Sequence, residues 1–530
     1  MKFDFDVVVI GFGPCGAVAA SLLGKAGIKI LAIDKLRDIY AIPRAIAIDH
    51  EIMRVFQNLG VADQVLPHIA PFTASEHFGA QGQLIRRIDM VEPPYPLGYI
   101  PSMVFTQPPV EAALRAHAAS YPNVEIALGQ SFKSLSQKKG YITVTLEDSD
   151  GQKRIIHTRY VIGCDGASSE VRKQLGIGLE DLIFDEPWVV VDVLANPSGL
   201  EKLPTKSAQY CDPTRPTTFI VGPGNHRRWE IMLNPDEDPS LMQTETEVWK
   251  LLARWINQDD GKLWRASSYR FHALVAREWR KENVFIAGDA AHQQPPFIGQ
   301  GMCQGIRDVA NLCWKLEEVI KGRAASALLD SYAVERGQHV RTLTARIKAI
   351  GHMICERDPN AAAARDAKLL ADNGGTPPSV TRQDIVPPLE AGLLSAHQHL
   401  ANGTLFPQPF VYANNDEQVL LDNITETSWR LVYDGRHDSL PAEVNPGIAT
   451  ISIISKSAAQ PVSEPPDGFS VVEQDDVVCN WFKKNACYAA LIRPDHYVYG
   501  VAETPDDIAN LLGDWRASPA GPLHEKEMSL

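Results

Sequence analysis

The 530-residue sequence lacks a surplus of basic residues. It contains 51 Lys and Arg against 65 Asp and Glu, which gives a formal net charge of −14. A protein that binds nucleic acid needs a basic surface that neutralises phosphates. We therefore expect no nucleic-acid partner.

Cysteine is also scarce, because eight residues are spread over the whole chain without a CxxC pair. So sparse a set does not form the disulfide framework of a small secreted domain, and it has no zinc-ligand spacing. We expect a reducing, cytoplasmic location and no metal site.

Long hydrophobic runs are absent apart from residues 7–24, which carry no charge over eighteen positions. This segment contains four glycines and a proline, and two aspartates precede it where a secretory signal would be basic. It is predicted to be a buried strand followed by a helix. We expect no membrane span and no signal peptide.

The strongest local pattern is GFGPCG at residues 11–16, which follows the strand-like DVVVI and opens a helix. Gly11 permits a tight turn, Gly13 lets the backbone approach a pyrophosphate, and Gly16 allows the helix to pack closely. Asp34 ends the next strand and is placed to accept hydrogen bonds from a ribose. The unit predicts one Rossmann-like fold. Because no second such unit follows, a nicotinamide cofactor would have to dock transiently.

Two later segments also follow strand-like stretches: GCDGASSEVR at residues 163–172 and GDAAHQQPPFIGQGMCQGIRD at 288–308. Asp289 is placed to bond a ribityl or ribose hydroxyl, with helix capping as the alternative. Residues 299–301 open a long helix whose free amides can face the pyrimidine edge of a flavin. A dinucleotide contacted by three segments so far apart is predicted to be FAD.

The order of these segments predicts an α/β protein of several domains, since 530 residues exceed what one core holds. Residues 1–185 and 271–356 are expected to form the FAD-binding domain, and a mostly antiparallel substrate-binding sheet is expected at 186–270. Residues 357–402 are predicted to be a partly irregular linker. A separate α/β domain is expected at 403–530.

The three segments, in this order and spacing, resemble the class A flavoprotein monooxygenases, the aromatic hydroxylases, over residues 1 to about 390. Within that part, GQGMCQGIRD, CDPTRP at 211–216 and RRWE at 227–230 are similar to 3-(3-hydroxyphenyl)propionate hydroxylases and related phenol hydroxylases. LIRPDHYVYG at 491–500 resembles the thioredoxin-like tail of some of these enzymes, without its CxxC.

The resemblance implies roles for single residues. Arg44 and Gln107 match positions that contact FAD, and Pro296 matches one whose carbonyl lies near the reactive flavin edge. Gln107 has the alternative of a helix-surface pair with Glu111. The predicted cofactor-binding residues are Gly11, Gly13, Pro14, Gly16, Asp34, Lys35, Arg44, Gln107, Asp165, Gly166, Gly288, Asp289, Pro296, Gly299, Gln300, Gly301 and Met302. Asp165 and Gly166 belong to a motif associated with both FAD and NAD(P)H.

The catalytic prediction is a base that helps to ionise a phenol, either Asp49 or His50, with Pro296 beside the flavin. The alternative for Asp49 is helix capping. A substrate carboxylate could pair with one of four arginines in the inserted sheet, and the sequence does not choose among Arg215, Arg227, Arg228 and Arg270.

The implied activity is a monooxygenase that uses FAD, NADH or NADPH, and O2 to hydroxylate a phenolic ring through a flavin C4a-hydroperoxide. The expected reaction is ortho-hydroxylation of a 3-hydroxyphenyl alkanoate or a similar phenol. Alternatives are an epoxidase, a halogenase, a hydroxylase of polycyclic polyketides, and a flavin-binding protein without catalysis. Lack of the WxWxIP element disfavours the halogenase. The sequence leaves a homodimer open.

Overall fold

The computed structural model describes residues 3–412, 417–425, 427–436, 447–458 and 468–522. Its first sheet has a parallel centre with the strand order β18-β11-β1-β2-β8 and an antiparallel edge strand, β17. A hairpin of β9 and β10 pairs with β11. The strands are β1 (Phe5–Ile10), β2 (Ile30–Asp34), β8 (Val124–Leu128), β9 (Gln130–Lys138), β10 (Tyr141–Asp148), β11 (Lys153–Gly163), β17 (Arg280–Lys281) and β18 (Val284–Ile286).

This topology brings the three glycine-rich segments together. Strands β18, β11 and β1 are parallel neighbours, so their carboxyl ends lie at one edge of the sheet. Each of the three motifs begins at one of these ends, and Asp34 ends the adjoining strand β2. Ligands of open α/β sheets bind at this edge. The predicted Rossmann-like fold is therefore confirmed.

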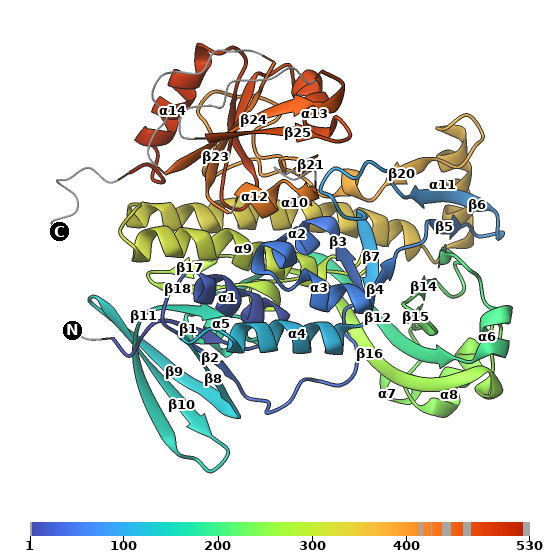
Figure 1. The fold of residues 1–530 in the computed structure, drawn as a ribbon. Helices are drawn as coiled ribbons and strands as arrows, with labels where there is room; N and C mark the ends of the chain where they lie inside the picture. The colour runs from blue at the N-terminus through green and yellow to red at the C-terminus, as the bar shows by residue number, and fades with distance from the viewer. Residues whose placement is uncertain (1–2, 413–416, 426, 437–446, 459–467, 523–530) are drawn as a thin grey trace.

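Helices cover this sheet and extend across the middle of the molecule (Figure 1). The two longest helices, α9 and α10, are shown in yellow tones and lie side by side beneath the C-terminal domain. The longer helices are α1 (Pro14–Lys25), α2 (His50–Leu59), α4 (Gln107–Ala119), α8 (Glu245–Leu252), α9 (Gly301–Ile320), α10 (Asp330–Ile354), α11 (Pro359–Ala371), α13 (Val477–Asn485) and α14 (Asp507–Ala517). The short ones are α3 (Ala62–Val65), α5 (Glu170–Gln174), α6 (Pro197–Lys202), α7 (Pro239–Met242) and α12 (Asp422–Thr425).

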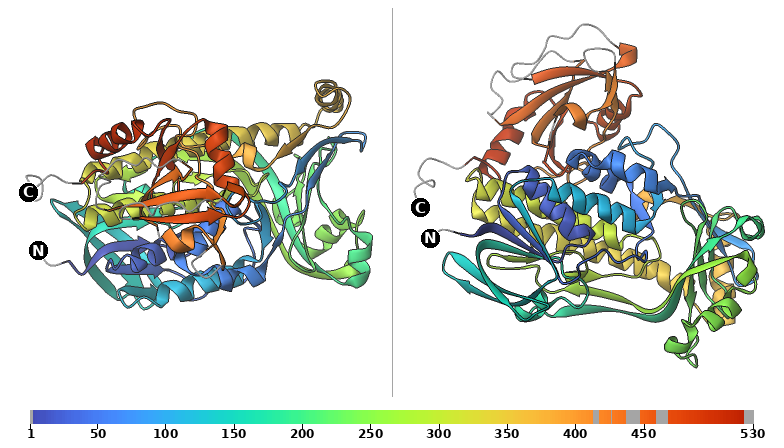
Figure 2. Two further views of the ribbon diagram at one scale, coloured as in Figure 1. Left: turned by 45° about the horizontal axis from the view of Figure 1, so that its top comes forward. Right: turned by 60° about the horizontal axis from the view of Figure 1, so that its bottom comes forward.

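A second, nine-stranded sheet lies at the opposite end of the body (Figures 1 and 2). Its order is β19-β16-β12-β15-β14-β13-β5-β6-β20, and all pairs are antiparallel except β13 with β5 and β6 with β20. The strands are β5 (Ser75–Phe78), β6 (Leu84–Asp89), β12 (Leu179–Ala195), β13 (Ser207–Tyr210), β14 (Thr217–Val221), β15 (His226–Met232), β16 (Gly261–Ala276), β19 (His292–Gln293) and β20 (Ser379–Thr381).

The sheet is larger than the insertion predicted at residues 186–270. Its longest strands, β12 and β16, have 17 and 16 residues and run back to the FAD-binding domain. Strands β5, β6 and β20 come from outside the insertion and extend one edge of the sheet. The sequence analysis missed them because pairing between such distant strands leaves no local pattern. A small third sheet joins β3 (Ala47–Asp49), β7 (Ser102–Phe105) and β4 (Ile69–Pro71).

The segment predicted as a partly irregular linker, 357–402, contains the 13-residue helix α11 as well as β20. Asp358 accepts a hydrogen bond from the Ala361 amide at 2.8 Å, and Pro359 occupies the first turn. An N-cap aspartate followed by proline is a strong helix start. The alanine-rich composition therefore belongs to a helix, which the prediction of a partly irregular linker did not specify, and the assignment of residues 357–402 as a linker stays a prediction.

The C-terminal domain contains a seven-stranded sheet ordered β22-β21-β25-β24-β23-β26-β27. Strands β23, β24 and β25 are parallel, β26 is antiparallel to β23, and β27 is antiparallel to β26. Bounds are β21 (Phe410–Tyr412), β22 (Gln418–Leu420), β23 (Trp429–Asp434), β24 (Ile448–Ser455), β25 (Gly468–Glu473), β26 (Ala489–Ile492) and β27 (Val498–Ala502). The predicted α/β domain is present, and its likeness to thioredoxin stays a prediction.

Buried ion pairs attach this domain to the body. Arg54 of α2 contacts Asp422 at 2.6 Å, and Arg493 contacts Glu335 of α10 at 2.7 Å. All eight cysteines lie within the described residues and are unpaired. Among the described helices, none has the length and apolar character needed to cross a bilayer.

Candidate active site

The glycine loop after β1 has the geometry that its sequence predicts. Gly11 has φ +94°, and a Cβ there would lie 2.3 Å from the carbonyl oxygen of Cys164. A Cβ on Gly16 would lie 1.9 Å from the Gly11 carbonyl oxygen, whereas Gly13 faces open space within 4 Å. Only glycine fits the first two positions, and the third leaves its backbone open to a phosphate.

Gln107 organises a second loop at the same edge. Its side-chain oxygen accepts hydrogen bonds from the backbone amides of Arg44 and Ala45, at 2.9 and 2.8 Å, and its nitrogen donates to Glu111. Gln107 is buried, so the helix-surface alternative does not describe it. The loop places the exposed Arg44 on the wall of the cavity described below.

We expect Gln107→Ala to weaken FAD binding by roughly 10- to 100-fold. Two amides lose their acceptor, which costs about 1–3 kcal/mol in the positioning of the loop. Fluorescence titration of the apoprotein with FAD measures the dissociation constant. Gln174→Ala is a matched control, because Gln174 also bonds two backbone groups but lies away from the cavity. An unchanged dissociation constant in Gln107→Ala would contradict this role.

The third segment forms the floor of the cavity. Gly288 is buried, whereas the neighbouring Asp289 is exposed towards the open space. Asp308 holds the turn by accepting from the Gly288 amide at 2.9 Å and contacting His292 at 2.8 Å. His292 is 1% exposed, which matches the packed turn residue that the sequence analysis considered as the alternative to a functional role. The carboxylate of Asp289 thus stays available to a ligand.

A cavity of about 570 Å³ lies between these loops and the second sheet. On the loop side it is lined by Gly13, Pro14, Arg44, Gln107, Gly166, Gly288, Asp289, Pro296, Gly299, Gly301 and Met302, all of which the sequence predicted. On the other side the lining residues come from β5, β12, β13, β14, β15 and β16. Volumes of this size are typical of small-molecule sites.

The sheet side of the cavity is built from rows of side chains that cross neighbouring strands. Residues directly opposite in a sheet point to the same face. The register places one row through His77, Gln209, Thr218, Glu230 and Val190, and all five line the cavity. We call this set the Glu230 row. The alternate residues Val189, Val191 and Trp229 face a hydrophobic core on the other side.

A second row runs through Ser207, Ile220, Arg228, Asp192 and Arg265, and we call it the Arg228 row. Asp192 is fully buried and accepts from Arg228 at 2.7 and 3.1 Å and contacts His226 at 2.7 Å. Burial opposes ionisation of Asp192, but the charge of Arg228 and these hydrogen bonds hold its pKa at about 2. The Arg228 row is therefore an ion-pair cluster in which two arginines share one aspartate.

Glu230 differs from Asp192 because its carboxyl has no matching partner. It is 4% exposed, and its Oε2 makes no hydrogen bond. Burial raises the pKa of Glu230 to about 7, which the charge of Arg228 opposes and that of Asp192 supports. A carboxyl with this pKa changes its charge near neutral pH.

The structure does not bring either predicted base into this cavity. Asp49 caps α2 by accepting from the Ile52 amide at 3.2 Å, and it pairs with Arg307 at 2.5 Å. Burial lowers the pKa of His50 to about 4. Both residues line a separate space of about 280 Å³ next to Pro101. The capping alternative for Asp49 describes its local role.

Some predicted residues lie away from the cavity or point away from it. The Gln300 side chain donates to Asp49 at 3.1 Å and accepts from Arg307 at 2.7 Å, so only its backbone belongs to the helix start. Asp165 accepts from the Glu170 and Val171 amides at the start of α5. The glycine loop and the first turn of α1 contain Gly11 and Gly16. The end of β2 is formed by Asp34, and Lys35 follows it.

The four arginines proposed for a substrate carboxylate separate into two pairs. Arg215 is bound to Glu237 at 2.6 and 2.7 Å, and Arg227 bonds carbonyl groups of its own turn, so neither lines the cavity. Arg228 and Arg270 do line it, although each pairs with an aspartate. The sequence analysis missed Arg265, Arg382 and Glu230 as cavity residues. For Glu230 and Arg265, the period-two alternation along β15 and β16 could have indicated the cavity face.

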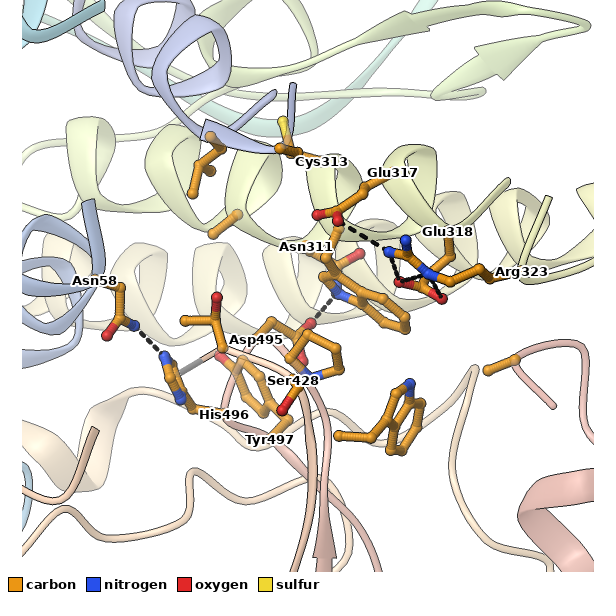
Figure 3. Close-up of a pocket in the computed structure, with 18 of the residues that line it drawn as sticks. Asn58, Asn311, Cys313, Glu317, Glu318, Arg323, Ser428, Asp495, His496 and Tyr497 are labelled. Atoms are coloured by element: carbon orange, nitrogen blue, oxygen red, sulfur yellow. Dashed lines mark hydrogen bonds and ion pairs between the residues drawn. The ribbon is translucent and has the colours of Figure 1, made fainter. Parts of the chain in front are cut away.

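A larger cavity of about 660 Å³ lies between α9 and the C-terminal domain (Figure 3). At one end Arg323 donates to Glu317 at 2.9 Å and also pairs with Glu318, and at the other Asn58 contacts His496. None of the predicted site residues lines this cavity. We therefore place the active site in the cavity of about 570 Å³ between the loops and the second sheet.

The cavity of about 570 Å³ and the loops that line it fit FAD. Gly13 leaves space beside its backbone, Asp289 is open, and the amides at the start of α9 adjoin Gly299 and Gly301 on the cavity wall. The buried amide of Gln294 lines the same cavity and has no partner among the described residues. These are donors and acceptors suited to a pyrophosphate, a ribityl chain and a polar ring edge.

Comparison with known proteins gives the same family. Residues 4–347 match the family described as FAD binding domain, and residues 403–517 match the HcaD C-terminal domain. The chain is 34% identical to a probable NADH-specific resorcinol 4-hydroxylase of Rhodococcus jostii, over 97% of this chain and 95% of the relative. It is 33% identical to a 3-(3-hydroxy-phenyl)propionate/3-hydroxycinnamic acid hydroxylase of Mycolicibacterium gilvum, over 81% and 75%.

The fold is also similar to that of a solved protein. The crystal structure of aklavinone-11 hydroxylase with FAD and aklavinone superposes with a TM-score of 0.76 at 20% identity, covering 97% of this chain and 99% of that one. The family match covers the three glycine-rich loops, α9, most of α10 and every strand of the second sheet except β20. The chain therefore belongs to the FAD-dependent aromatic monooxygenases.

Proposed function

We propose that this enzyme hydroxylates a monocyclic phenol that has a second substituent at the 3-position. The new hydroxyl group is placed on a ring carbon next to an existing hydroxyl group, and NADH is the reductant. Resorcinol and 3-(3-hydroxyphenyl)propionate share this 3-hydroxyphenyl pattern, and both occur in the names of the similar proteins. The observation that carries the proposal is the cavity that joins the FAD-binding loops to a polar sheet wall.

The protein itself holds the cofactor, shields the cavity from water and polarises the substrate. Bound FAD supplies the redox chemistry, which is hydride acceptance and O2 activation. The start of α9, at Gly301, favours negative charge on the group that it faces. Phe271 stacks on Trp188 at 5.4 Å and Phe297 packs edge-on against it, so an apolar surface beside the polar rows keeps water out.

The size of the cavity favours a single-ring substrate over a polycyclic one. The volume of about 570 Å³ is lined by both the flavin-facing loops and the sheet rows, so a flavin ring and a substrate would share it. Arg228 and Arg270 in the wall already have aspartate partners, whereas Arg382 bonds a hydroxyl and a carbonyl group and pairs with no carboxylate among the described residues. A substrate carboxylate at Arg228 or Arg270 would compete with these aspartates, whereas one at Arg382 would not, so the screen below includes both resorcinol and the propionate.

A substrate screen tests this proposal. Purified enzyme with FAD is mixed with NADH and resorcinol, 3-(3-hydroxyphenyl)propionate or a tricyclic phenol, and NADH oxidation, O2 uptake and product mass are followed. We expect stimulated NADH oxidation and the gain of one oxygen atom with resorcinol. Product only from the tricyclic phenol would support the polyketide hydroxylase, and FAD binding without turnover would support a flavin-binding protein. NADPH in place of NADH tests the choice of reductant.

A cytoplasmic location and a homodimer complete the proposal. All eight cysteines are unpaired, which is typical of proteins in a reducing compartment. Size-exclusion chromatography with light scattering tests the dimer, and a monomer mass at micromolar concentration would exclude it.

A further inference from the structure

Glu230 occupies the middle of a polar row that the cofactor-binding loops do not use. It lies on β15 between Thr218 of β14 and Val190 of β12, and all three side chains face the cavity. Thr218 donates to the Gln209 oxygen at 2.9 Å, so its hydroxyl is already engaged. Burial lowers the pKa of His77, at the end of the row, to about 3, so His77 is neutral. Glu230 is thus the only group in the row that ionises near neutral pH.

The charges around Glu230 come from three strands. Arg228 lies two residues earlier on β15, Asp192 lies on β12, and Arg265 lies on β16. Arg228 and Arg265 both direct their cationic groups to Asp192, at 2.7 and 3.6 Å. Neither donates a hydrogen bond to Glu230 among the described contacts, and its Oε2 has no partner. A buried carboxyl oxygen without a donor is costly unless a ligand satisfies it.

We propose that Glu230 is the residue that binds the hydroxyl group of the phenol and accepts its proton. This assignment rests on the proposed phenol hydroxylation and names the base of that reaction. The phenol O–H bond breaks, the proton goes to Glu230 Oε2, and the electron pair stays on the phenol oxygen. The ring becomes richer in electrons and so more reactive towards an oxygen electrophile. When the oxygen atom has been transferred, the ring carbon that received it releases its hydrogen as a proton, and the other oxygen atom of O2 leaves as water. The proton held by Glu230 returns to the phenol oxygen.

This assignment replaces Asp49 and His50 on geometric grounds. Asp49 is held by Arg307 and by the first turn of α2, and it lines another cavity. A general base must be within hydrogen-bond reach of the proton that it takes. Glu230 lines the cavity, so a phenol placed against the sheet wall can come within hydrogen-bond reach of it.

The test compares the wild type with Glu230→Gln as FAD-loaded enzymes, with resorcinol and NADH, from about pH 5.5 to 9. We expect kcat/KM of the wild type to rise about 10-fold per pH unit below pH 7 and then to level off, because only the ionised carboxylate accepts the proton. Glu230→Gln should lose this rise and be about 100-fold slower at pH 8. Its flavin spectrum and its reduction by NADH without phenol should not change. Glu230→Asp, which keeps a carboxylate, should retain the pH-dependent rise.

Glu76→Gln is the matched control, since Glu76 precedes His77 on β5, faces the other side of the sheet and pairs with surface Lys206. We expect its rates to stay within twofold of the wild type. Resorcinol turnover by the wild type together with an unchanged Glu230→Gln profile would refute the assignment alone. A wild type that oxidises NADH with none of the phenols would refute both the proposed function and this assignment.

Discussion

Glu335→Gln is expected to destabilise the attachment of the C-terminal domain by about 3–5 kcal/mol. Glu335 lies on α10 and is fully buried with Lys315 of α9 and Arg493 of the C-terminal domain, both at 2.7 Å. Its oxygens also accept from Asn311 and from the Leu393 amide. Removal of the carboxylate leaves a buried ammonium without an anion, and breaking a buried pair from one side costs this much.

The loss can be measured as the shift of the urea unfolding midpoint, followed by tryptophan fluorescence. Trp314 and Trp429 pack edge to face at the same junction and report on it. Glu317→Gln serves as the control, because that side chain is 29% exposed and pairs with surface Lys321, where an ion pair contributes less than about 1 kcal/mol. Equal midpoints for the two variants would show that the buried cluster does not hold the domain.

The same cluster has a defined pH dependence. The charges of Arg493 and Lys315 overcome the effect of burial and hold the pKa of Glu335 at about 2, below its usual 4.5. The stabilising contribution is therefore present above pH 4.5 and is lost as the pH falls towards 2. Glu335→Gln should unfold in acid without this loss, since its side chain does not titrate.

Gly16→Ala should abolish FAD retention, the second of the two largest effects. The added Cβ would lie 1.9 Å from the Gly11 carbonyl oxygen, and this obstructing group is backbone, which cannot shift easily. We expect about 3 kcal/mol of destabilisation and a glycine loop displaced from the phosphate path. The purified variant should be colourless, and FAD titration should show at least a roughly 100-fold weaker affinity.

Gly13→Ala separates the cofactor effect from the effect on the fold. Its added Cβ has open space within 4 Å, so the unfolding temperature of the apoprotein should match that of the wild type. FAD affinity should nevertheless fall, since the methyl group fills the path of the pyrophosphate. A Gly16→Ala protein that is purified with full FAD content would contradict the steric argument.

The loops of the FAD-binding domain could be predicted because each is a local pattern. A strand, a glycine turn and a helix start occupy consecutive residues, and Gly11, Gly13 and Gly16 have geometric requirements that no other residue meets. The parallel neighbours β18, β11 and β1 then bring the segments together. The position of Asp49 outside the FAD-side cavity could not be predicted, because adjacency in sequence to a cofactor-contacting loop does not give the direction of a side chain.

The sheet wall could not be predicted because it is non-local. His77 and Glu230 are far apart in sequence and share a row only through the pairing of four strands. Register follows from turns and from the buried face together, and a shift by one residue would turn Glu230 away from the cavity. The helix at residues 359–371 was not predicted for a simpler reason. The segment was expected to be a partly irregular linker, although Asp358 and Pro359 mark a helix start.

The two rows across the second sheet also bear on how this enzyme can change over time. Each position on the cavity face alternates with a residue such as Trp229, which belongs to the opposite core. A substitution at Thr218 or Gln209 therefore alters the chemistry offered to the ring and leaves that core untouched. New preferences can evolve one position at a time, without the cost of rebuilding the scaffold.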